Sequence, residues 1–529
     1  MCKDNGTFTK TNRSVTQYKD VFLTDGKVNQ RIFLQGEVGS GKTTFAAMMA
    51  LDWCGKAPCE PHIFTDVNVL QEFTFVFHIA LRNSFECYDV TEMIKDQIIN
   101  CIYSSKEDRK KAYKLLNEIM TRERCLALLD GLDEWTSPDS HHNIPTLVEK
   151  HSSCVMLITT RPWKLAAGYV KHSEIDRLLK LKGIQNSFDF AKRVLSCMVE
   201  EDELQQKYWA FEKYIWDQNL EKLMSSPLML SVIVCSYAEG TELKGSKCEI
   251  YSMLLDVLLK KATSEKKYIQ QPRVSCFKET QYIQPNLAKV NHIAEAAFRL
   301  MFSDKRENAL VFGAKDLDAL VDDEERVFAL KTGILTESES SSSVRALSTF
   351  SFRHKSIQEF LSAYHIACNE HVINTTISGY LNRHDTLYRD ISQVFLFLCG
   401  MRISAANALS YVMDACENYA LIENYIETYH QDCICDGYKE AVANKQTGIN
   451  LTLSHFKIYR YDEDLEQLWV MNQSKVISLV VKTTLHHSSY YEKYPSKIVV
   501  DLSSCHKMKS LTVICDETDL EGKICFFYQ

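Results

Sequence analysis

A glycine-rich turn near the N-terminus constrains the fold more than any other segment of this 529-residue chain. The apolar run 32–34 leads into residues 36–44, Gly-Glu-Val-Gly-Ser-Gly-Lys-Thr-Thr, and the helix-forming segment 45–50 follows. This order of strand, G-x-x-x-x-G-K-T loop and helix is typical of a phosphate-binding loop. The glycines let successive backbone N–H groups face inward, and the helix start adds the positive end of its dipole. The pattern therefore predicts a nucleotide site.

Every residue of this loop receives a nucleotide-binding role. We expect Lys42 to reach the terminal phosphates and the Thr43 hydroxyl to ligate Mg²⁺. The full predicted set is Gly36, Glu37, Val38, Gly39, Ser40, Gly41, Lys42, Thr43 and Thr44. The alternative is a chance match in an ordinary turn, but that does not account for the strand before the loop and the helix after it.

A second motif, residues 125–134, combines a short apolar run with three carboxylates. The run predicts a buried strand, and Asp130 follows at its carboxyl end, where open α/β sheets bind ligands. We therefore expect Asp130 to hold the same Mg²⁺ that Thr43 contacts. Asp133 and Glu134 are candidates for orienting an attacking water, and the alternative for these two alone is a solvated acidic turn. Together the two motifs indicate a nucleotide site.

The pattern along the chain divides it into six segments. Strands alternate with helices from about residue 31 to 184, which predicts an α/β fold with a doubly wound parallel sheet. Helical periodicity dominates beyond residue 184. The expected segments are a polar leader over 1–29, a nucleotide-binding domain over 30–184, a helical domain over 185–270, a winged-helix domain over 271–370, a second helical domain over 371–448 and a C-terminal α/β segment over 449–529.

Two of these segments carry more specific predictions. Residues 327–369 have the order helix, strand, serine-rich stretch, strand and helix, which is the layout of a winged helix, and the run 337–343 predicts a flexible loop. The spacing within 500–513 resembles a leucine-rich repeat. The side chains expected to face inward there are Leu502, Met508, Leu511 and Val513. Because a solenoid needs about three repeats, a small α/β cap is the alternative.

Composition is that of an ordinary globular protein, with 45% hydrophobic and 25% charged residues. The net charge of −8 argues against nucleic acid as an obligatory partner, because phosphate contacts need a basic surface. The start of the chain has no apolar signal-peptide core, and no run approaches the ~20 apolar residues that span a bilayer. The 19 cysteines are scattered without paired C-x₂-C spacing. We expect reduced thiols, no membrane span and a cytoplasmic location.

Taken together, these residues resemble the NACHT family of signal-transduction NTPases, which includes the NOD-like receptors. Residues 36–44 resemble its Walker A motif, and 128–134, Leu-Leu-Asp-Gly-Leu-Asp-Glu, resemble its extended Walker B motif. Residues 158–162 are similar to its sensor 1 strand, and the resemblance implies that Arg161 approaches the γ-phosphate.

Two further segments extend the resemblance into the helical part of the chain. Residues 226–230, Ser-Pro-Leu-Met-Leu, resemble the helix start whose proline, Pro227 here, packs near adenine. Residues 352–363 resemble the winged-helix segment, which implies that His354 contacts the β-phosphate of bound ADP. The alternative for His354 is that it only caps the helix that follows it.

The resemblance implies a molecular switch with ATP/ADP and Mg²⁺ as cofactors. It implies a closed state with ADP, an open state with ATP, slow hydrolysis, and homo- or hetero-oligomerisation on activation in innate immune or related intracellular signalling. The protein signalling partner stays unidentified, and the roughly 30 residues ahead of the sheet are too few for a separate effector domain.

Two other functions are alternatives to the switch. A continuously cycling ATPase of the AAA+-like remodelling type is compatible with the three carboxylates, whereas the winged helix favours the switch. A small-molecule kinase fits poorly, because no lid or acceptor-pocket motif follows the phosphate loop.

Overall fold

The computed structural model divides the chain into two units, and each unit combines distant parts of the sequence. Unit 1 contains residues 1–243, 260–262 and 299–357, and unit 2 contains residues 244–259, 263–298 and 358–529. The structure describes residues 2–4, 7–9, 14–36, 39–55, 64, 66–84, 87–135, 144–148, 151, 153–161, 164–165, 170–184, 186–218, 220–221, 223–240, 243, 245–260, 271–278, 280–303, 310–340, 347–383, 390–416, 429–458, 463–483, 498–515 and 524–527.

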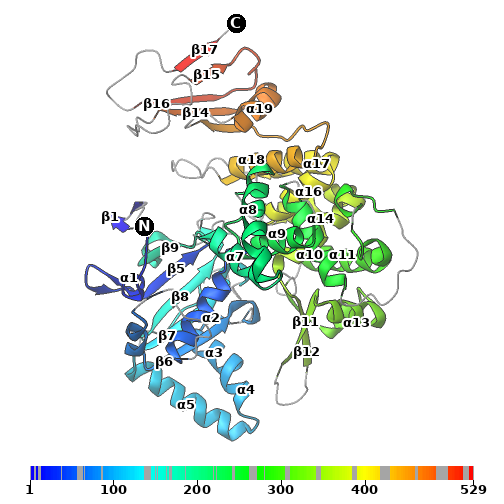
Figure 1. The fold of residues 1–529 in the computed structure, drawn as a ribbon. Coiled ribbons are helices and arrows are strands. Elements are labelled where there is room, and N and C mark those ends of the chain that lie inside the picture. The colour runs from blue at the N-terminus through cyan, green and yellow to red at the C-terminus, as the bar shows by residue number, and fades with distance from the viewer. Residues whose placement is uncertain are drawn as a thin grey trace. The chain divides into compact units, whose positions relative to one another are not determined.

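Unit 1 is built on a five-stranded, entirely parallel sheet (Figure 1). Its strands are β5 (Arg31–Gln35), β6 (Phe75–Ala80), β7 (Cys125–Asp130), β8 (Val155–Thr160) and β9 (Arg177–Lys180). Their order across the sheet is β6-β7-β8-β5-β9, so β8 lies between the strand that enters the glycine-rich turn and the strand that ends at Asp130. This confirms the predicted parallel sheet.

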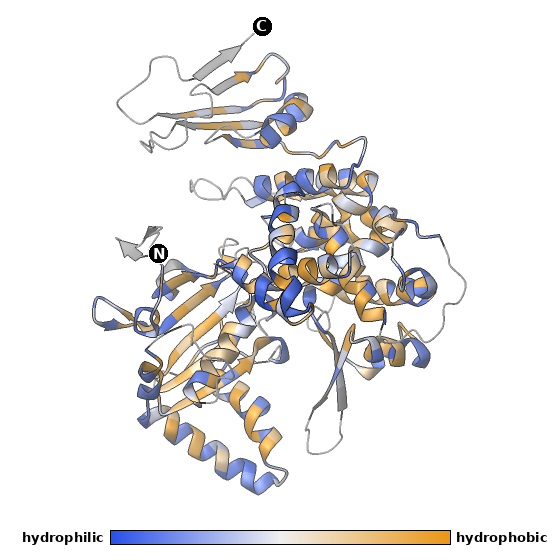
Figure 2. Cartoon of the chain, viewed as in Figure 1, coloured by the Kyte–Doolittle hydropathy of each residue, from blue (hydrophilic) through white to orange (hydrophobic). Residues whose placement is uncertain are grey.

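Helices cover both faces of this sheet. Successive side chains of a strand point to opposite faces, so one strand contributes to two hydrophobic clusters. Phe33 belongs to the hydrophobic cluster that also contains residues of α3 (Val90–Ile94) and α5 (Lys106–Arg122). Its neighbours Ile32 and Leu34 belong to the cluster that contains Met49 of α2 (Lys42–Trp53). In Figure 2 the strands of the sheet are mostly coloured as hydrophobic. The doubly wound α/β prediction therefore holds for this part of unit 1.

Part of the predicted polar leader packs onto the sheet. Residues Tyr18–Phe22 form α1, in which Tyr18, Val21 and Phe22 are buried. The Tyr18 hydroxyl donates a hydrogen bond of 2.6 Å to Asp52 of α2. Segment 1–29 is thus not uniformly a leader, because one apolar face of this short helix completes the core. Its other described elements are β1 (Cys2–Asp4), β2 (Thr7–Thr9), β3 (Leu23–Thr24) and β4 (Lys27–Val28).

The rest of unit 1 is helical, apart from a small antiparallel sheet of order β10-β12-β11. Its elements are the short α4 (Asn100–Ile102), then α7 (Ser187–Ser196), α8 (Glu201–Asp217), α9 (Pro227–Ala238), β10 (Val311–Gly313), α12 (Ala314–Asp318), α13 (Asp323–Thr332), β11 (Leu335–Ser340), β12 (Leu347–Phe352) and the first residues of α14 (Lys355–Cys368). The order α13, β11, β12, α14 is the one that the winged-helix prediction requires, and that identity stays a prediction.

The serine-rich run differs from its predicted loop. Residues up to Ser340 continue strand β11, where Glu337 pairs with Phe350 and Ser340 pairs with Leu347. Cross-strand pairing with an apolar partner strand overrides the loop-like composition here. Residues 341–343 of the predicted loop lie outside the described residues.

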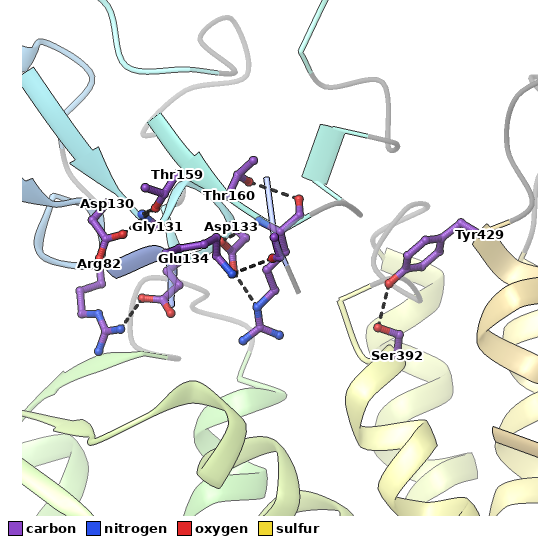
Figure 3. A network of polar contacts seen from close by, with 12 residues as sticks. Arg82, Asp130, Gly131, Asp133, Glu134, Thr159, Thr160, Ser392 and Tyr429 are labelled. Carbon is purple, nitrogen blue, oxygen red and sulfur yellow. Dashed lines mark hydrogen bonds and ion pairs between the residues drawn. The ribbon is translucent and has the colours of Figure 1, made fainter. Parts of the chain in front are cut away.

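Unit 2 contains helices followed by two small parallel sheets, of order β13-β14-β16 and β15-β17. Its elements are α10 (Lys247–Lys260), α11 (Leu287–Met301), the remainder of α14, α15 (Ser378–Arg383), α16 (Ser392–Met401), α17 (Ile403–Cys416), α18 (Tyr429–Ala443), β13 (His455–Ile458), α19 (Glu463–Asn472), β14 (Ser478–Thr483), β15 (Ile498–Asp501), β16 (Ser510–Cys515) and β17 (Ile524–Phe527). The Ser392 and Tyr429 hydroxyls, 2.9 Å apart, join α16 to α18 (Figure 3).

The predicted inward face at the C-terminus is only partly correct. Leu502 is buried and Met508 is half-buried, but Leu511 and Val513 are 40% and 42% exposed. Both lie on one face of β16, because they are two residues apart. Ser510 and Thr512 on the other face are exposed as well, so neither face of β16 is buried at these positions. The leucine-rich-repeat identity stays a prediction.

Across the described residues, no helix is long and apolar enough to cross a membrane. The described cysteines form no disulfide. The same residues contain no cluster of three or more histidine, cysteine, aspartate or glutamate side chains that could hold a metal ion.

Candidate nucleotide-binding site

The glycine-rich turn has the backbone conformation that its sequence predicts. Gly39 and Gly41 adopt φ angles of 71° and 94°, a left-handed region that side chains with a Cβ rarely enter. Helix α2 begins directly afterwards at Lys42. The turn therefore presents backbone to the start of a helix, as a phosphate cradle requires. Glu37 and Val38, which the sequence assigns to the same cradle, lie outside the described residues.

Side chains of the turn are arranged toward its interior. The Lys42 ammonium donates a hydrogen bond of 2.7 Å to the carbonyl oxygen of Gly36. The Ser40 hydroxyl is buried and has no hydrogen-bond partner within the described part of the chain. Thr43 and Thr44 are exposed in the first turn of α2. A buried hydroxyl without a partner is costly, and a phosphate oxygen would supply the missing hydrogen bond, so the turn fits an anionic ligand.

Strand β8 links this turn to the acidic motif on β7. The Gly36 N–H donates to the carbonyl oxygen of Thr160 at 3.1 Å. One residue earlier, the Thr159 hydroxyl donates to the Asp130 carboxylate at 2.6 Å and accepts the Gly131 N–H at 2.9 Å (Figure 3). The carboxylate is thereby held at the end of its strand.

The predicted Mg²⁺ ligands have suitable chemistry. Asp130 offers a partly exposed carboxylate and Thr43 an exposed hydroxyl. Mg²⁺ prefers such oxygen ligands and keeps several waters of its own. The residues present therefore fit a magnesium ion that is bound together with phosphates.

Two residues with separate predicted roles, Asp133 and Arg161, form a buried ion pair. The Arg161 Nε lies 2.9 Å from Asp133 Oδ2, and the Arg161 backbone N–H donates to Asp133 Oδ1 at 3.2 Å. The two side chains are only 8% and 3% exposed. In this structure Asp133 binds Arg161 through both carboxylate oxygens, which favours a structural role for Asp133.

The remaining carboxylate, Glu134, pairs with a residue that the sequence reasoning did not assign to the site. Arg82 lies 2.7 Å from Glu134 Oε2 (Figure 3), on the 3₁₀ turn η2 (Leu81–Asn83) that follows β6. The signal was present in the sequence, because Arg82 follows a predicted strand at the edge where Asp130 also lies. The pairing itself depends on β6 lying beside β7.

Several charges act on the Glu134 side chain, which is 13% exposed. Burial raises the pKa of the Glu134 carboxyl, and the nearby Asp133 adds to this increase. Arg82, Lys355 and Arg161 oppose it by favouring the carboxylate form.

The start of helix α9 contacts the glycine-rich turn directly. Ser226 caps α9 by accepting the Met229 N–H at 3.5 Å, and its hydroxyl donates to the carbonyl oxygen of Gly39 at 3.1 Å. Pro227 is adjacent, since a Cβ on Gly41 would lie 3.7 Å from its ring. The predicted proline is thus brought to the loop, although nothing in the structure tests its contact with adenine.

His354 lies immediately before α14, and its carbonyl accepts the Ile357 N–H at 3.0 Å. Its side chain is exposed, and its pKa lies below the usual range because neighbouring protein displaces hydrating water. The charges of Arg353 and Arg82 lower the pKa further. Apart from His354, each predicted site residue that the structure describes lies at the phosphate loop or at the acidic edge.

Comparison with known proteins finds similarity over the part of the chain that contains this site. The model of the NACHT domain matches residues 30–201. The chain is 27% identical over 234 residues to NLR family CARD domain-containing protein 4 from Xenopus tropicalis, covering 43% of this chain and 21% of that protein. It is 28% identical over 148 residues to NACHT, LRR and PYD domains-containing protein 10 from Homo sapiens, covering 25% of this chain and 20% of that protein. The matched regions span about a fifth of each relative.

Proposed function

Because the chain carries a NACHT domain of the NLR type over residues 30–201, we propose that it is a nucleotide-operated switch. ADP holds the closed state, exchange for ATP favours an open state that oligomerises, and slow hydrolysis returns the protein to rest. The similarity to an NLR family protein and to a protein with NACHT and LRR in its name supports a role in innate immune or related intracellular signalling.

The observation that carries this proposal is the hydrogen bond from Ser226 to the Gly39 carbonyl. It joins the first residue of a helix beyond the sheet to the turn that would bind the phosphates. This contact supports the proposal, because it offers a direct route from the turn to α9 for a change such as gain or loss of a γ-phosphate. A simple catalyst needs no such connection, whereas a switch depends on one.

Each residue has a defined part in this proposal. Lys42 exchanges its bond with the Gly36 carbonyl for the terminal phosphates, and Ser40 donates its buried hydroxyl. Asp130 and Thr43 hold Mg²⁺, which neutralises phosphate charge when it is bound. Glu134 accepts a proton from the attacking water.

Energetics indicate that no single contact operates the switch. Moving a population from 1:99 to 99:1 requires about 5.5 kcal/mol of differential binding. One hydrogen bond to a charged group contributes roughly 1.5–3 kcal/mol. The His354–phosphate bond that we propose is therefore one of several differences between the two states.

Mass spectrometry of nucleotide released from the purified protein tests the proposal. We expect ADP at near-stoichiometric amounts and turnover at or below about 10⁻² s⁻¹, the range of slow GTPase switches. Protein purified without nucleotide, which also fails to bind added ADP or ATP, would contradict it.

A continuously cycling ATPase is the second candidate. The observation that favours it is the full set of carboxylates, Asp130, Asp133 and Glu134, at one sheet edge. Turnover well above 10⁻² s⁻¹ without any activating ligand, with little retained ADP, would support this function instead.

A further inference from the structure

We propose that Arg82 is a positioning residue, which holds the Glu134 carboxylate where it accepts a proton from the attacking water. This inference rests on the proposed hydrolytic function and adds to it a residue outside both phosphate-site motifs.

The fold brings the two residues together from distant points of the sequence. Strand β6 pairs with β7 in parallel, and Ala80 stands opposite Asp130 at the ends of the two strands. Arg82 follows β6 and Glu134 follows β7, so both leave the sheet at the same edge. Their side chains meet at 2.7 Å through Glu134 Oε2. A carboxylate has a second oxygen, and Oε1 is the atom that we assign to the water.

The other nearby carboxylate is committed elsewhere. Asp133 accepts both the side-chain Nε and the backbone N–H of Arg161. With both of its oxygens engaged in a buried pair, Asp133 is poorly placed to orient water. Glu134, which binds its cation through one oxygen, is the better candidate.

Arg82 also favours the ionised form of Glu134. A general base must carry its charge at the working pH. Burial and Asp133 disfavour the charged form, whereas Arg82, Arg161 and Lys355 favour it. Among these cations, Arg82 has a 2.7 Å contact with the Glu134 carboxylate. Its loss would raise the pKa of Glu134 and remove the restraint on its position.

The test is the pH dependence of single-turnover ATP hydrolysis in wild type, Arg82→Gln and Arg82→Lys. Below the pKa of a general base, the rate falls about tenfold per pH unit. We expect the acid limb of Arg82→Gln to lie at higher pH than that of wild type. Arg82→Lys keeps a positive charge, so its limb should lie between the two. Nucleotide content should be unchanged in both variants.

The matched control is Arg124→Gln. Arg124 forms an ion pair with Glu72 at the opposite end of β7, away from the acidic edge. We expect its pH profile to follow wild type even if its melting temperature falls. The double variant Arg82→Gln/Glu134→Gln should hydrolyse no more slowly than Glu134→Gln alone, because Arg82 acts through Glu134.

The outcomes separate this inference from the function on which it rests. A wild type that hydrolyses ATP, together with an Arg82→Gln profile that coincides with it, would overturn the inference alone. A wild type that retains nucleotide without hydrolysing it would overturn the hydrolytic step and this inference together. If Arg82→Gln does not fold, the pH profile of Arg82→Lys tests the inference. An acid limb at the same pH as that of wild type then counts against the inference.

Discussion

The hydroxyl of Ser226 makes two hydrogen bonds that belong to different parts of unit 1. It accepts the Met229 N–H inside α9 and donates to the Gly39 carbonyl in the phosphate loop. A third close approach supports this contact, because a Cβ on Gly183 would lie 1.8 Å from the Ser225 carbonyl oxygen. The loop, the segment that follows β9 and the start of α9 are therefore in mutual contact.

Ser226→Ala should lower stability and also accelerate nucleotide release. Loss of an N-cap costs about 0.5–2 kcal/mol, and the lost bond to Gly39 leaves the loop less constrained. The matched control is Ser105→Ala, which removes the N-cap of α5 without a contact to the loop. Chemical denaturation and stopped-flow release of a fluorescent ADP measure the two effects. Equal release rates in both variants would mean that the contact is not part of the coupling.

Lys42→Ala should abolish nucleotide binding and lower the melting temperature. A ligand at 100 times its Kd stabilises the folded state by about 2.7 kcal/mol, and the variant loses this contribution. Thermal unfolding with and without added ADP provides the measurement. Lys110→Ala, at an exposed position of α5, serves as the control and should keep the ADP-dependent shift. A similar ADP-dependent shift in Lys42→Ala would contradict the phosphate-loop assignment.

Asp130→Ala and Glu134→Gln should separate metal binding from hydrolysis. Asp130→Ala removes a metal ligand, so we expect weaker ATP affinity in the presence of Mg²⁺ and little change in EDTA. Glu134→Gln keeps the side-chain shape without its charge, so binding should persist while hydrolysis slows by about 10²- to 10⁴-fold. Equilibrium binding and single-turnover assays distinguish the two. Normal hydrolysis in both variants would mean that residues 130–134 are only a solvated acidic turn.

Removing one partner of the Asp133–Arg161 pair should destabilise unit 1. Breaking a buried pair typically costs about 3–5 kcal/mol, because the other charge is left uncompensated. We therefore expect Asp133→Ala to be severely destabilising and Asp133→Ala/Arg161→Met to recover part of the loss. Glu72→Ala is the control, since its pair with Arg124 is exposed and contributes about 0–1 kcal/mol. Urea unfolding measures all three, and equal losses for Asp133→Ala and Glu72→Ala would argue against a structural role.

His354→Leu should release ADP faster while binding ATP nearly as well, and should favour the oligomeric form. Comparison of ADP off-rates and gel-filtration profiles is the test. Equal off-rates with an unchanged monomer peak would remove His354 from the mechanism.

His354 also makes a pH-dependent contribution to stability. Its folded-state pKa lies below the unfolded value of about 6.5, so the unfolded chain binds its proton more tightly. The folded protein therefore loses stability as the pH falls below about 6.5, and the loss ends below the folded-state pKa. His354→Leu should lack this part of the loss, which unfolding curves between pH 7 and pH 5 would reveal.

Local sequence predicted the parts of the site that depend on local geometry. Gly39 and Gly41 specify their own backbone conformation, and Asp130 follows from an apolar run that ends in a carboxylate. The pairings required tertiary information. Arg82 and Glu134 are 52 residues apart, and only the neighbouring positions of β6 and β7 bring them together.

The differences elsewhere have a similar origin. Ser338 and Ser340 have a loop-like composition, yet pairing with β12 places them in a strand. Tyr18 and Phe22 stand in a polar stretch, yet the sheet provides an apolar surface that buries them. Strand β12 and the apolar face of the sheet lie outside these two segments in the sequence, so the segments alone do not predict the pairing or the burial.

Strand β8 holds its two neighbours in chemically different ways, and this has a consequence for divergence among related chains. The link to Gly36 uses the backbone carbonyl of Thr160, which any residue supplies, whereas the link to Asp130 uses the Thr159 hydroxyl. We expect substitutions to accumulate at position 160 among residues that suit a buried strand, while position 159 exchanges only with serine. A one-residue insertion within β8 ahead of Thr159 would break the link to Asp130, since it would turn each following side chain to the opposite face.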